Sequence, residues 1–315
     1  MSKKKKDEVA KNKSPLSLIR KKRIKAQMRS LQNKLIIGTV QFGLNYGINN
    51  MSGQVSIDEA DKILALAKKA NVCFIDTSSA YGNSEKILGT ILDNYPRGFN
   101  VISKYPQSDK SVYDMFKESL KQMKQSRLYG YLVHHFDFYK KNPSIWDSFL
   151  RLKEQKLVQK IGFSIYHIEE LEFLLNNKVK FDLVQFPYNI FDRQFAPYLS
   201  ILKNLGVEIH TRSVFLQGLF FKEILSLPQK LLPLKSHLNE LHKYCDAHSI
   251  SIEKLALGFV TSNPLIDKVL IGVDGIKQFE KNIAICNYCI SDKDASFVSS
   301  IDVTEKNLLN PVNWN

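Results

Sequence analysis

The sequence is poor in cysteine and has no long hydrophobic run. Its four cysteines are scattered through 315 residues, too few for a disulfide framework, so we expect a reducing compartment. The longest apolar runs are far too short to span a bilayer, and the start of the chain lacks the apolar core of a secretory signal. The chain therefore reads as a cytoplasmic globular protein, and its hydrophobic content of 44% is enough for a sizeable core.

Acidic residues are scarce in the first 30 residues, where twelve Lys or Arg face only Asp7 and Glu8. Most of the net charge of +14 therefore belongs to this tail, with clusters at Lys3–Lys6 and Arg20–Arg23. We interpret residues 1–31 as a basic, disordered extension. Attachment to acidic lipid, to another acidic surface or to nucleic acid is the alternative. Specific nucleic-acid recognition is not expected, because no aromatic residues are interleaved with the charges.

A dinucleotide-binding glycine fingerprint is also missing. The first apolar run is followed by Gly38-Thr-Val-Gln-Phe-Gly43, which is not G-x-G-x-x-G, and this argues against an open doubly wound sheet. Eight short apolar runs instead alternate with helical patterns, and several are continuously apolar, as strands buried on both faces are. The expected strands are Leu35–Val40, Val72–Ile75, Asn100–Ser103, Tyr129–Val133, Lys160–Ser164, Leu183–Phe186, Glu208–Thr211 and Lys268–Ile271.

Helical patterns fill the intervals between these runs. The expected helices are Ile57–Ala70, Glu85–Asp93, Val112–Lys124, Ile145–Gln155, Glu169–Leu175, His237–Ala247, Ile252–Ser262 and Lys277–Cys286. Repeated β-then-α units imply a parallel sheet, and eight of them predict an α/β fold of the (β/α)₈ TIM barrel type. We place the barrel at residues 32–290 and a C-terminal segment at 291–315, which either folds back over the barrel mouth or frays.

Polar residues follow the expected strands. The stretch Phe74–Glu85 runs from a buried strand into a polar loop and then into a helix that Asn83 or Ser84 is placed to cap. Asp76 ends the strand and Tyr81 lies in the loop. The polar residues that close or follow the strands are Asp76, Lys104, His134, Ser164, Gln185, Arg212 and Asp274. Because a TIM barrel carries its active site at the strand C-termini, these side chains form the expected site.

The motifs together resemble the aldo-keto reductase superfamily, in the family's order and over roughly Leu35 to Tyr288. They are Ile75–Glu85, Ile102-Ser-Lys104, Tyr131-Leu-Val-His134, Ile161-Gly-Phe-Ser164, Val184–Asn189 and Ile271-Gly272 with Asn282. The resemblance implies an NAD(P)H-dependent enzyme that reduces the carbonyl of an aldehyde, ketone or keto-sugar. It also implies a barrel that binds the cofactor in extended form at its mouth, and no metal.

The family's catalytic tetrad falls on Asp76, Tyr81, Lys104 and His134. Tyr81 is the expected general acid, and Lys104 beside it is expected to stabilise the phenolate and lower the pKa of Tyr81. Asp76 is expected to hold Lys104 charged and in place. His134 is expected to hydrogen-bond the carbonyl oxygen or share the proton transfer, with the adjacent His135 as the rival for that role.

The resemblance also implies cofactor contacts. The expected residues are Gly38, Thr39, Ser164, Gln185, Arg212, Ser213, Gly272, Gln278 and Asn282. Ser164 and Gln185 match residues that hold the nicotinamide carboxamide, although Ile165 stands where the family often has Asn. Arg212 stands where many members stack an aromatic ring on the nicotinamide, and a planar guanidinium can stack as well. A salt bridge at the barrel rim is the alternative role for Arg212.

The resemblance favours NADPH over NADH, but the residues after the last strand leave both open. Gly272 and Gln278 stand where NADPH-preferring members place basic residues. Lys277 or Lys281 is available to meet a 2′-phosphate. Asp274 is suited instead to accept from a ribose hydroxyl, which would fit NADH.

The substrate and the partners are less well defined. The stretch Gly38–Gly47 is similar to reductases of bacterial surface-sugar biosynthesis, which suggests a keto-sugar. One alternative function is a cofactor-binding regulatory or scaffold subunit with little turnover. A second is a membrane- or nucleic-acid-associated protein that acts through its basic tail. Cys286-x-x-Cys289 lacks a second ligand pair, so no metal site is expected. The sequence leaves the oligomeric state open.

Overall fold

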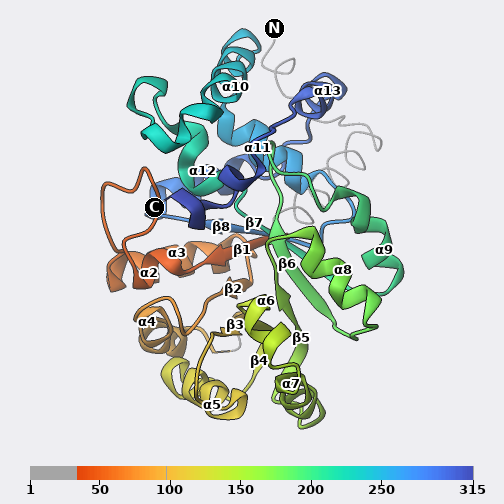
Figure 1. The fold of residues 1–315 in the computed structure, drawn as a ribbon. Helices are drawn as coiled ribbons and strands as arrows, with labels where there is room; N and C mark the ends of the chain where they lie inside the picture. Colours follow the sequence, from red (N-terminus) through yellow and green to blue (C-terminus); the bar gives the residue numbers. More distant parts are fainter. Residues whose placement is uncertain (1–33, 97, 315) are drawn as a thin grey trace, which may run out of the picture.

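The computed structural model describes residues 34–96 and 98–314. Eight parallel strands close into a barrel in the order β1 to β8, and the first and last strands pair in register from Leu35 with Val269 to Gly38 with Gly272 (Figure 1). The strands are β1 (Leu35–Gly38), β2 (Phe74–Asp76), β3 (Asn100–Tyr105), β4 (Leu128–Val133), β5 (Val158–Ser164), β6 (Leu183–Pro187), β7 (Glu208–Arg212) and β8 (Lys268–Gly272). The predicted (β/α)₈ barrel and its eight strands are confirmed.

Alternating strand residues build two separate cores. Inside the barrel, Ile36, Ile102, Leu132 and Leu183 form one buried cluster. Their chain neighbours, such as Ile37, Val101 and Val184, point outward and join a larger cluster under the helices. Because both faces of every strand are covered, the strands read as continuous apolar runs and not as alternating ones.

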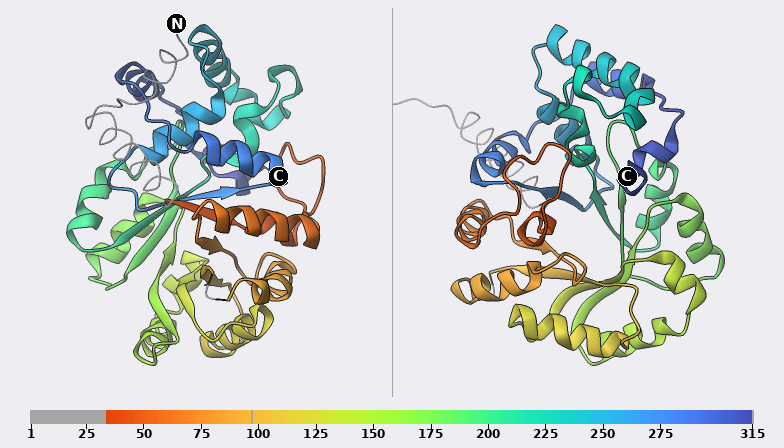
Figure 2. Two further views of the ribbon diagram at one scale, coloured as in Figure 1. Left: turned by 180° about the vertical axis from the view of Figure 1, so that it is seen from behind. Right: turned by 60° about the vertical axis from the view of Figure 1, so that its left-hand side comes forward.

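Helices surround the barrel on all sides (Figure 2). They are α2 (Val40–Gly43), α3 (Ile57–Lys69), α4 (Ser84–Ile91), α5 (Val112–Met123), α6 (Phe136–Lys141), α7 (Ile145–Glu154), α8 (Ile168–Asn176), α9 (Leu199–Asn204), α10 (Lys235–Ala247), α11 (Ile252–Thr261), α12 (Ile276–Ile285) and α13 (Asp292–Ser300). All eight predicted helices are present to within about two residues at each end. The short helices α2, α6 and α9 were not predicted, because four to six residues show no clear helical period.

The cap expected for α4 is not formed by a side chain. Asn83 occupies the N-cap position, but its side chain makes no capping hydrogen bond. Ser84 lies inside the helix, and its hydroxyl donates to Thr39 instead, at 2.8 Å from Thr39 Oγ1. The two residues thus tie the start of α4 to the end of β1.

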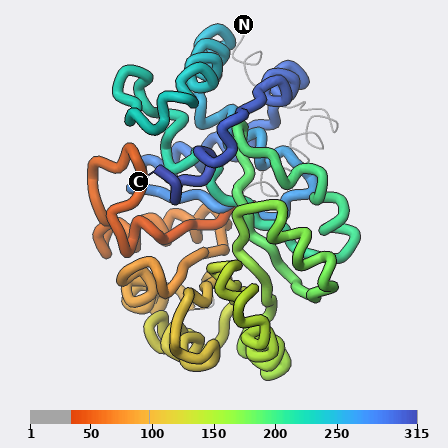
Figure 3. The backbone as a smooth tube through the Cα atoms, in the orientation of Figure 1, coloured from red at the N-terminus to blue at the C-terminus, as the bar shows by residue number. Residues whose placement is uncertain are grey.

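The C-terminal residues return to the barrel mouth, where Pro311, Val312 and Trp314 line the cavity described below (Figure 3). Trp314 is fixed there by its indole N–H, which donates to the carbonyl oxygen of Leu308 at 2.8 Å. Between β7 and α10, the chain contains the 3₁₀ helices Leu216–Phe221, Ile224–Ser226 and Gln229–Leu234. The expected basic extension at residues 1–31 lies outside the described residues. Among the described helices, none combines the length and the apolarity needed to cross a membrane.

Candidate active site

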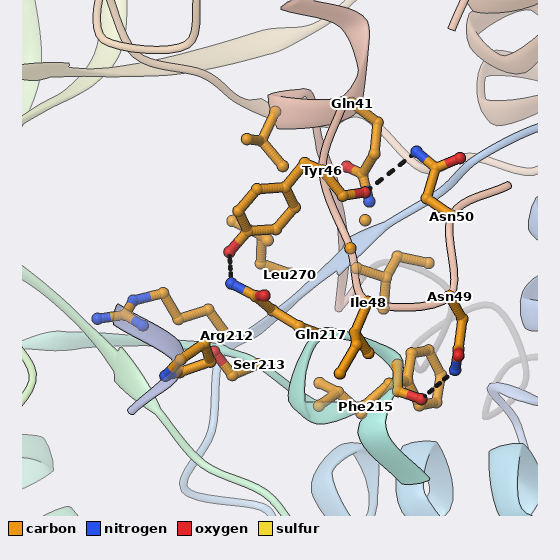
Figure 4. A pocket seen from close by; sticks show the side chains of 18 of the residues that line it. Gln41, Tyr46, Ile48, Asn49, Asn50, Arg212, Ser213, Phe215, Gln217 and Leu270 are labelled. Atoms are coloured by element: carbon orange, nitrogen blue, oxygen red, sulfur yellow. Dashed lines mark hydrogen bonds between the residues drawn. The ribbon is translucent and has the colours of Figure 1, made fainter. Parts of the chain in front are cut away.

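A cavity of about 800 Å³ opens at the C-terminal ends of the strands. Asp76, Tyr81 and His134 are among the residues that line it. Side chains of the loops after β1 and β7, such as Tyr46 and Gln217, also line it (Figure 4). The cavity is therefore at the end of the barrel where TIM-barrel enzymes carry their chemistry.

A buried ion pair lies under the cavity. The Lys104 ammonium contacts Asp76 Oδ1, and both side chains are almost completely shielded from solvent. Lys104 also donates to the carbonyl oxygen of Thr77 at 2.9 Å, and Gln185 Nε2 donates to Asp76 Oδ2 at 2.8 Å. Burial lowers the pKa of Lys104, while the charge and hydrogen bond of Asp76 oppose the decrease. A buried charge of this kind is stable only because it is paired and hydrogen-bonded.

Tyr81 lies directly beside this pair. The Lys104 ammonium is 3.4 Å from the phenol oxygen. A Cβ on Gly43 would lie 1.7 Å from the Tyr81 carbonyl oxygen, so only glycine lets α2 pack this closely against the Tyr81 loop. Burial raises the pKa of Tyr81, and the charge of Asp76 adds to the increase. The pKa of Tyr81 is therefore raised and not lowered as expected, because desolvation of the phenol and the charge of Asp76 outweigh the opposing charge of Arg212.

His134 completes the group. Its ring lies edge-on to the Tyr81 ring, with 5.7 Å between the centroids, and its Nδ1 is 3.1 Å from Ser78 Oγ. Burial and the positive charge of Lys104 lower the pKa of His134 well below its usual value, so the ring is neutral near pH 7. His135 is exposed and does not line the cavity.

Ser78 was not singled out in the sequence, although it lies in the loop between Asp76 and Tyr81. Its oxygen accepts from the backbone N–H of Ala80 at 3.1 Å, which leaves the hydroxyl hydrogen for His134 Nδ1. If the Ser78 hydroxyl donates to Nδ1, the neutral His134 ring carries its hydrogen on Nε2. His134 Nε2–H is then the hydrogen-bond donor that is available to a ligand in the cavity.

Most of the residues expected to contact the cofactor line the same cavity. They are Gly38, Ser164, Gln185, Arg212, Ser213, Gly272 and Gln278. Thr39 and Asn282 are not among the lining residues. Thr39 is buried behind the cavity, where its hydroxyl donates to the Asp76 carbonyl oxygen at 3.1 Å, and Asn282 is buried in α12.

Arg212 is positioned by stacking. Its guanidinium carbon lies 3.8 Å from the centroid of the Tyr166 ring, and Nη2 donates to the Ile165 carbonyl oxygen at 3.0 Å. Within residues 34–96 and 98–314, no carboxylate forms a salt bridge with it. The rim salt bridge is thus not formed, and a planar cation faces the cavity.

The far end of the cavity has the polarity of a nucleotide site. Burial raises the pKa of the Asp274 carboxyl, and a hydrogen bond from the Gln41 side chain partly offsets this increase. The Gln41 Oε1 atom is buried without a hydrogen-bond partner in the described structure. A Cβ on Gly272 would lie 2.5 Å from the Gln41 amide nitrogen, so a larger residue here would displace the Gln41 side chain. An unfilled acceptor above a glycine floor fits a ligand with hydroxyl donors, such as a dinucleotide.

Two loops join above the cavity. Ile48 N donates to the Gln217 carbonyl oxygen at 3.1 Å, and Asn49 Nδ2 donates to the Gly218 carbonyl oxygen at 2.6 Å. The Gln217 amide also contacts the Tyr46 hydroxyl (Figure 4). We call this set of contacts the loop clasp. It connects residues 44–54 after β1 with residues 213–221 after β7.

No group of three or more His, Cys, Asp or Glu side chains in the described part of the chain is arranged to hold a metal ion. The site consists of a phenol, a buried ion pair, a neutral imidazole and a polar cleft.

Comparison with known proteins identifies this arrangement. The family model described as "Aldo/keto reductase family" matches residues 34–303. The chain belongs to the aldo/keto reductase family. Its members reduce small-molecule carbonyl compounds with NAD(P)H, which makes this chain an NAD(P)H-dependent oxidoreductase.

The chain is similar to several individual proteins, with low sequence identity. L-galactose dehydrogenase of Arabidopsis thaliana is 26% identical over 284 residues, which cover 82% of this chain and 88% of the relative. NADH-specific methylglyoxal reductase of Escherichia coli (strain K12) is 22% identical over 275 residues, with coverages of 74% and 84%. The holo form of an aldo-keto reductase from Bacillus halodurans shares the fold, with a TM-score of 0.68 at 15% identity, covering 87% of this chain and 94% of that one.

Proposed function

We propose that this aldo/keto reductase reduces the carbonyl group of a hydroxylated aldehyde or ketone, with Tyr81 as the general acid. The observation that carries the proposal is the contact of 3.4 Å between the Tyr81 phenol and the fully buried Lys104 ammonium at the base of the cavity. A phenol and an ammonium held together in a dry site are suited to deliver one proton and stabilise the anion left behind.

Each residue of the group has a separate task. When bound, NAD(P)H supplies the hydride to the carbonyl carbon. Tyr81 donates its proton to the carbonyl oxygen, and Lys104 stabilises the phenolate. Asp76 holds Lys104 in position, and Gln185 in turn holds the second carboxylate oxygen of Asp76. His134, neutral and with Nε2–H free, donates a hydrogen bond to the carbonyl oxygen and orients it.

The raised pKa of Tyr81 supports the role of acid. Because burial keeps the phenol protonated near pH 7, the proton is present when the substrate arrives. The same burial leaves Lys104 as the cation closest to the oxygen that becomes charged. The proton transfer is thus favoured only once negative charge develops on the substrate oxygen.

We propose a sugar-like or other hydroxylated carbonyl compound as the substrate. The outer cavity offers hydrogen-bonding groups to hydroxyls, namely Asn45, Tyr46, Asn49, Asn50 and Gln217. The Arabidopsis relative is by name a dehydrogenase of a sugar, and the E. coli relative a reductase of a small ketoaldehyde. A keto-sugar, as the sequence suggested, satisfies both the polar lining and the carbonyl chemistry.

The test compares wild type with Tyr81→Phe on a panel of aldehydes, hydroxyketones and keto-sugars, following cofactor absorbance. We expect kcat/KM of the variant to fall by about 10²–10⁴-fold, the range for loss of a general acid. The exposed Tyr113→Phe is the matched control and should retain wild-type rates. Equal rates in Tyr81→Phe and wild type would remove Tyr81 from the mechanism. Cofactor binding without turnover on any substrate would favour the regulatory-subunit alternative.

A further inference from the structure

The end of the cavity farthest from the expected chemistry is formed by the segment after β8. The hydride must be delivered near Tyr81, so an extended cofactor places its adenosine half toward Gly272, Asp274 and Gln278, which line the cavity. In TIM barrels, phosphate groups commonly bind at the loops after strands 7 and 8 and at the N-terminus of a helix there. The groups that surround the start of α12 therefore decide whether a 2′-phosphate is accepted.

The backbone donors at this position are already used by the protein. Glu59 of α3 accepts from the backbone N–H of Ile276, the first residue of α12, with 2.7 Å between Oε1 and N. Gln278 Oε1 accepts from the backbone N–H of Asp274, also at 2.7 Å. A carboxylate and an amide oxygen thus occupy donors that would otherwise attract a phosphate.

The groups that remain free are hydrogen-bond acceptors. The Asp274 carboxyl is half-buried at the cavity wall, and the adjacent Gln41 Oε1 is buried with no partner among the described residues. Ribose hydroxyls donate hydrogen bonds and satisfy such acceptors. A 2′-phosphate offers only acceptors near neutral pH and brings negative charge next to Asp274 and Glu59, so it is repelled.

The nearby cations are directed elsewhere. Lys281 forms an ion pair with Glu253 of α11, and Lys62 contacts Glu59 from its own helix at 3.8 Å, with a strongly exposed side chain. Lys277 is exposed on α12 and does not line the cavity. None of the three lies in the cavity wall.

We infer that Asp274 and Gln41, which line the cavity, together with Glu59, which occupies the backbone donor at the start of α12, favour NADH over NADPH. The inference rests on the proposed function only in placing the hydride at Tyr81. It replaces the preference for NADPH that the sequence resemblance favoured. Glu59, which lies more than two hundred residues before α12 in the sequence, was not recognisable as part of this site from sequence alone.

The test is a binding titration without substrate, in which quenching of tryptophan fluorescence gives Kd for NADH and for NADPH. We expect wild type to bind NADH at least about tenfold more tightly, which corresponds to about 1.4 kcal/mol. In the double variant Glu59→Gln/Asp274→Asn, which keeps the side-chain shapes, NADPH should bind about tenfold more tightly than to wild type because two like charges are removed. The Kd for NADH should change less than that for NADPH.

Two controls make the result specific. Glu154→Gln removes a negative charge from the exposed end of α7 and should leave both Kd values unchanged, which excludes an effect of net charge. Lys277→Met should leave the NADPH Kd unchanged if this lysine takes no part. The inference is overturned if wild type binds NADPH more tightly, if the ratio of the two Kd values is the same in the double variant, or if neither dinucleotide binds.

Failure of this inference is distinguishable from failure of the proposed function. A protein that reduces carbonyls in a Tyr81-dependent manner with NADPH retains the function and loses the selectivity. A protein that binds NADH selectively but reduces no carbonyl retains the selectivity and loses the function.

Discussion

Lys104 is a cation with no exposure to solvent, and at the scale of single residues it determines the chemistry of the site. Moving an ammonium into a protein interior costs several kcal/mol, which pairing with a carboxylate only partly offsets. Asp76 and the Thr77 carbonyl provide that compensation here. The protein thus keeps in its core a charge that contributes little to stability, and in the proposed mechanism this charge stabilises the phenolate of Tyr81.

The first residue-scale prediction separates stability from activity at this pair. Lys104→Met and Asp76→Leu should each lower the free energy of unfolding by about 3–5 kcal/mol, because each leaves its partner buried and unpaired. The double variant should be more stable than either single variant, since no charge remains in the core. Urea unfolding gives the three values, and all three variants should have lost carbonyl reduction. If the double variant loses the sum of the two single losses, the pair is not coupled.

The tetrad was predictable residue by residue because its members follow apolar strands and recur in one family pattern. The residues that these side chains contact were harder to predict from the sequence. Ser78 meets His134 across 56 positions of sequence, and Gln41 meets Asp274 from the opposite end of the chain. Such pairings follow from closure of the barrel and leave no local pattern. The direction of the Tyr81 pKa shift could also not be predicted, because the sequence does not show that a tyrosine in a loop is buried.

At the scale of elements, the loop clasp joins two loops that line the cavity. The two loops lie about 170 residues apart, and three hydrogen bonds connect them. Gln217 and Gly218 both have positive φ, 53° and 90°, which turns their carbonyl oxygens toward the other loop. An arrangement held by a few polar contacts opens more easily than the barrel beneath it.

Loosening the clasp should accelerate dissociation of the cofactor. Asn49→Ala removes the bond to the Gly218 carbonyl, and we expect koff to rise about fivefold for the loss of roughly 1 kcal/mol. Stopped-flow displacement of bound NADH measures this rate. Asn142→Ala, at the end of α6, removes a similar bond at a distance from the cavity and should not change koff. An unchanged koff in Asn49→Ala would show that the clasp does not retain the cofactor.

Helices and strands could be predicted where their apolar pattern extended over enough residues. Every strand was recognised from its apolar run, and so was every helix of two turns or more except α13, which lies in the segment 291–315 where no helix was expected. The segment Leu199–Asn204 was missed because a helix of one and a half turns is stabilised by packing on β7 and not by its own pattern. The clasp could not be predicted either, since two loops with no repeating pattern carry no information about which of them meet.

At the scale of the whole molecule, a second charged group closes the other end of the barrel. Glu208 contacts Lys160 and accepts from the Tyr129 hydroxyl at 2.7 Å, and its second oxygen lies 2.6 Å from His210 Nε2. Burial alone raises the pKa of Glu208, but the hydrogen bond and charge of His210, with Lys160 and Tyr129, outweigh burial and hold the pKa well below its usual value.

This group predicts how stability depends on pH. Because the pKa of Glu208 is lower in the folded state, the unfolded state takes up the proton first as the pH falls. The stabilisation is complete above the ordinary value of 4.5 and decreases as the pH falls below it. Glu208→Gln should be less stable than wild type at pH 7 and should lose less stability between pH 5 and pH 3. Urea unfolding across this range measures both. The exposed Glu240→Gln should follow wild type, and a variant with the wild-type acid slope would contradict the assignment.

The pairing of β1 with β8 also affects how the protein is made. Leu35 lies opposite Val269, so at the usual speed of translation the first strand waits roughly 10–50 s for its partner. During that time β1 is an open edge, and the charged Asp76 and Lys104 side chains lie on a sheet that is not yet closed. Nascent chains of this length depend on protection from aggregation until the ring is complete. Activity on the ribosome should therefore begin only after Gly272 has left the exit tunnel, because Gly38 and Gly272 together form the floor of the site.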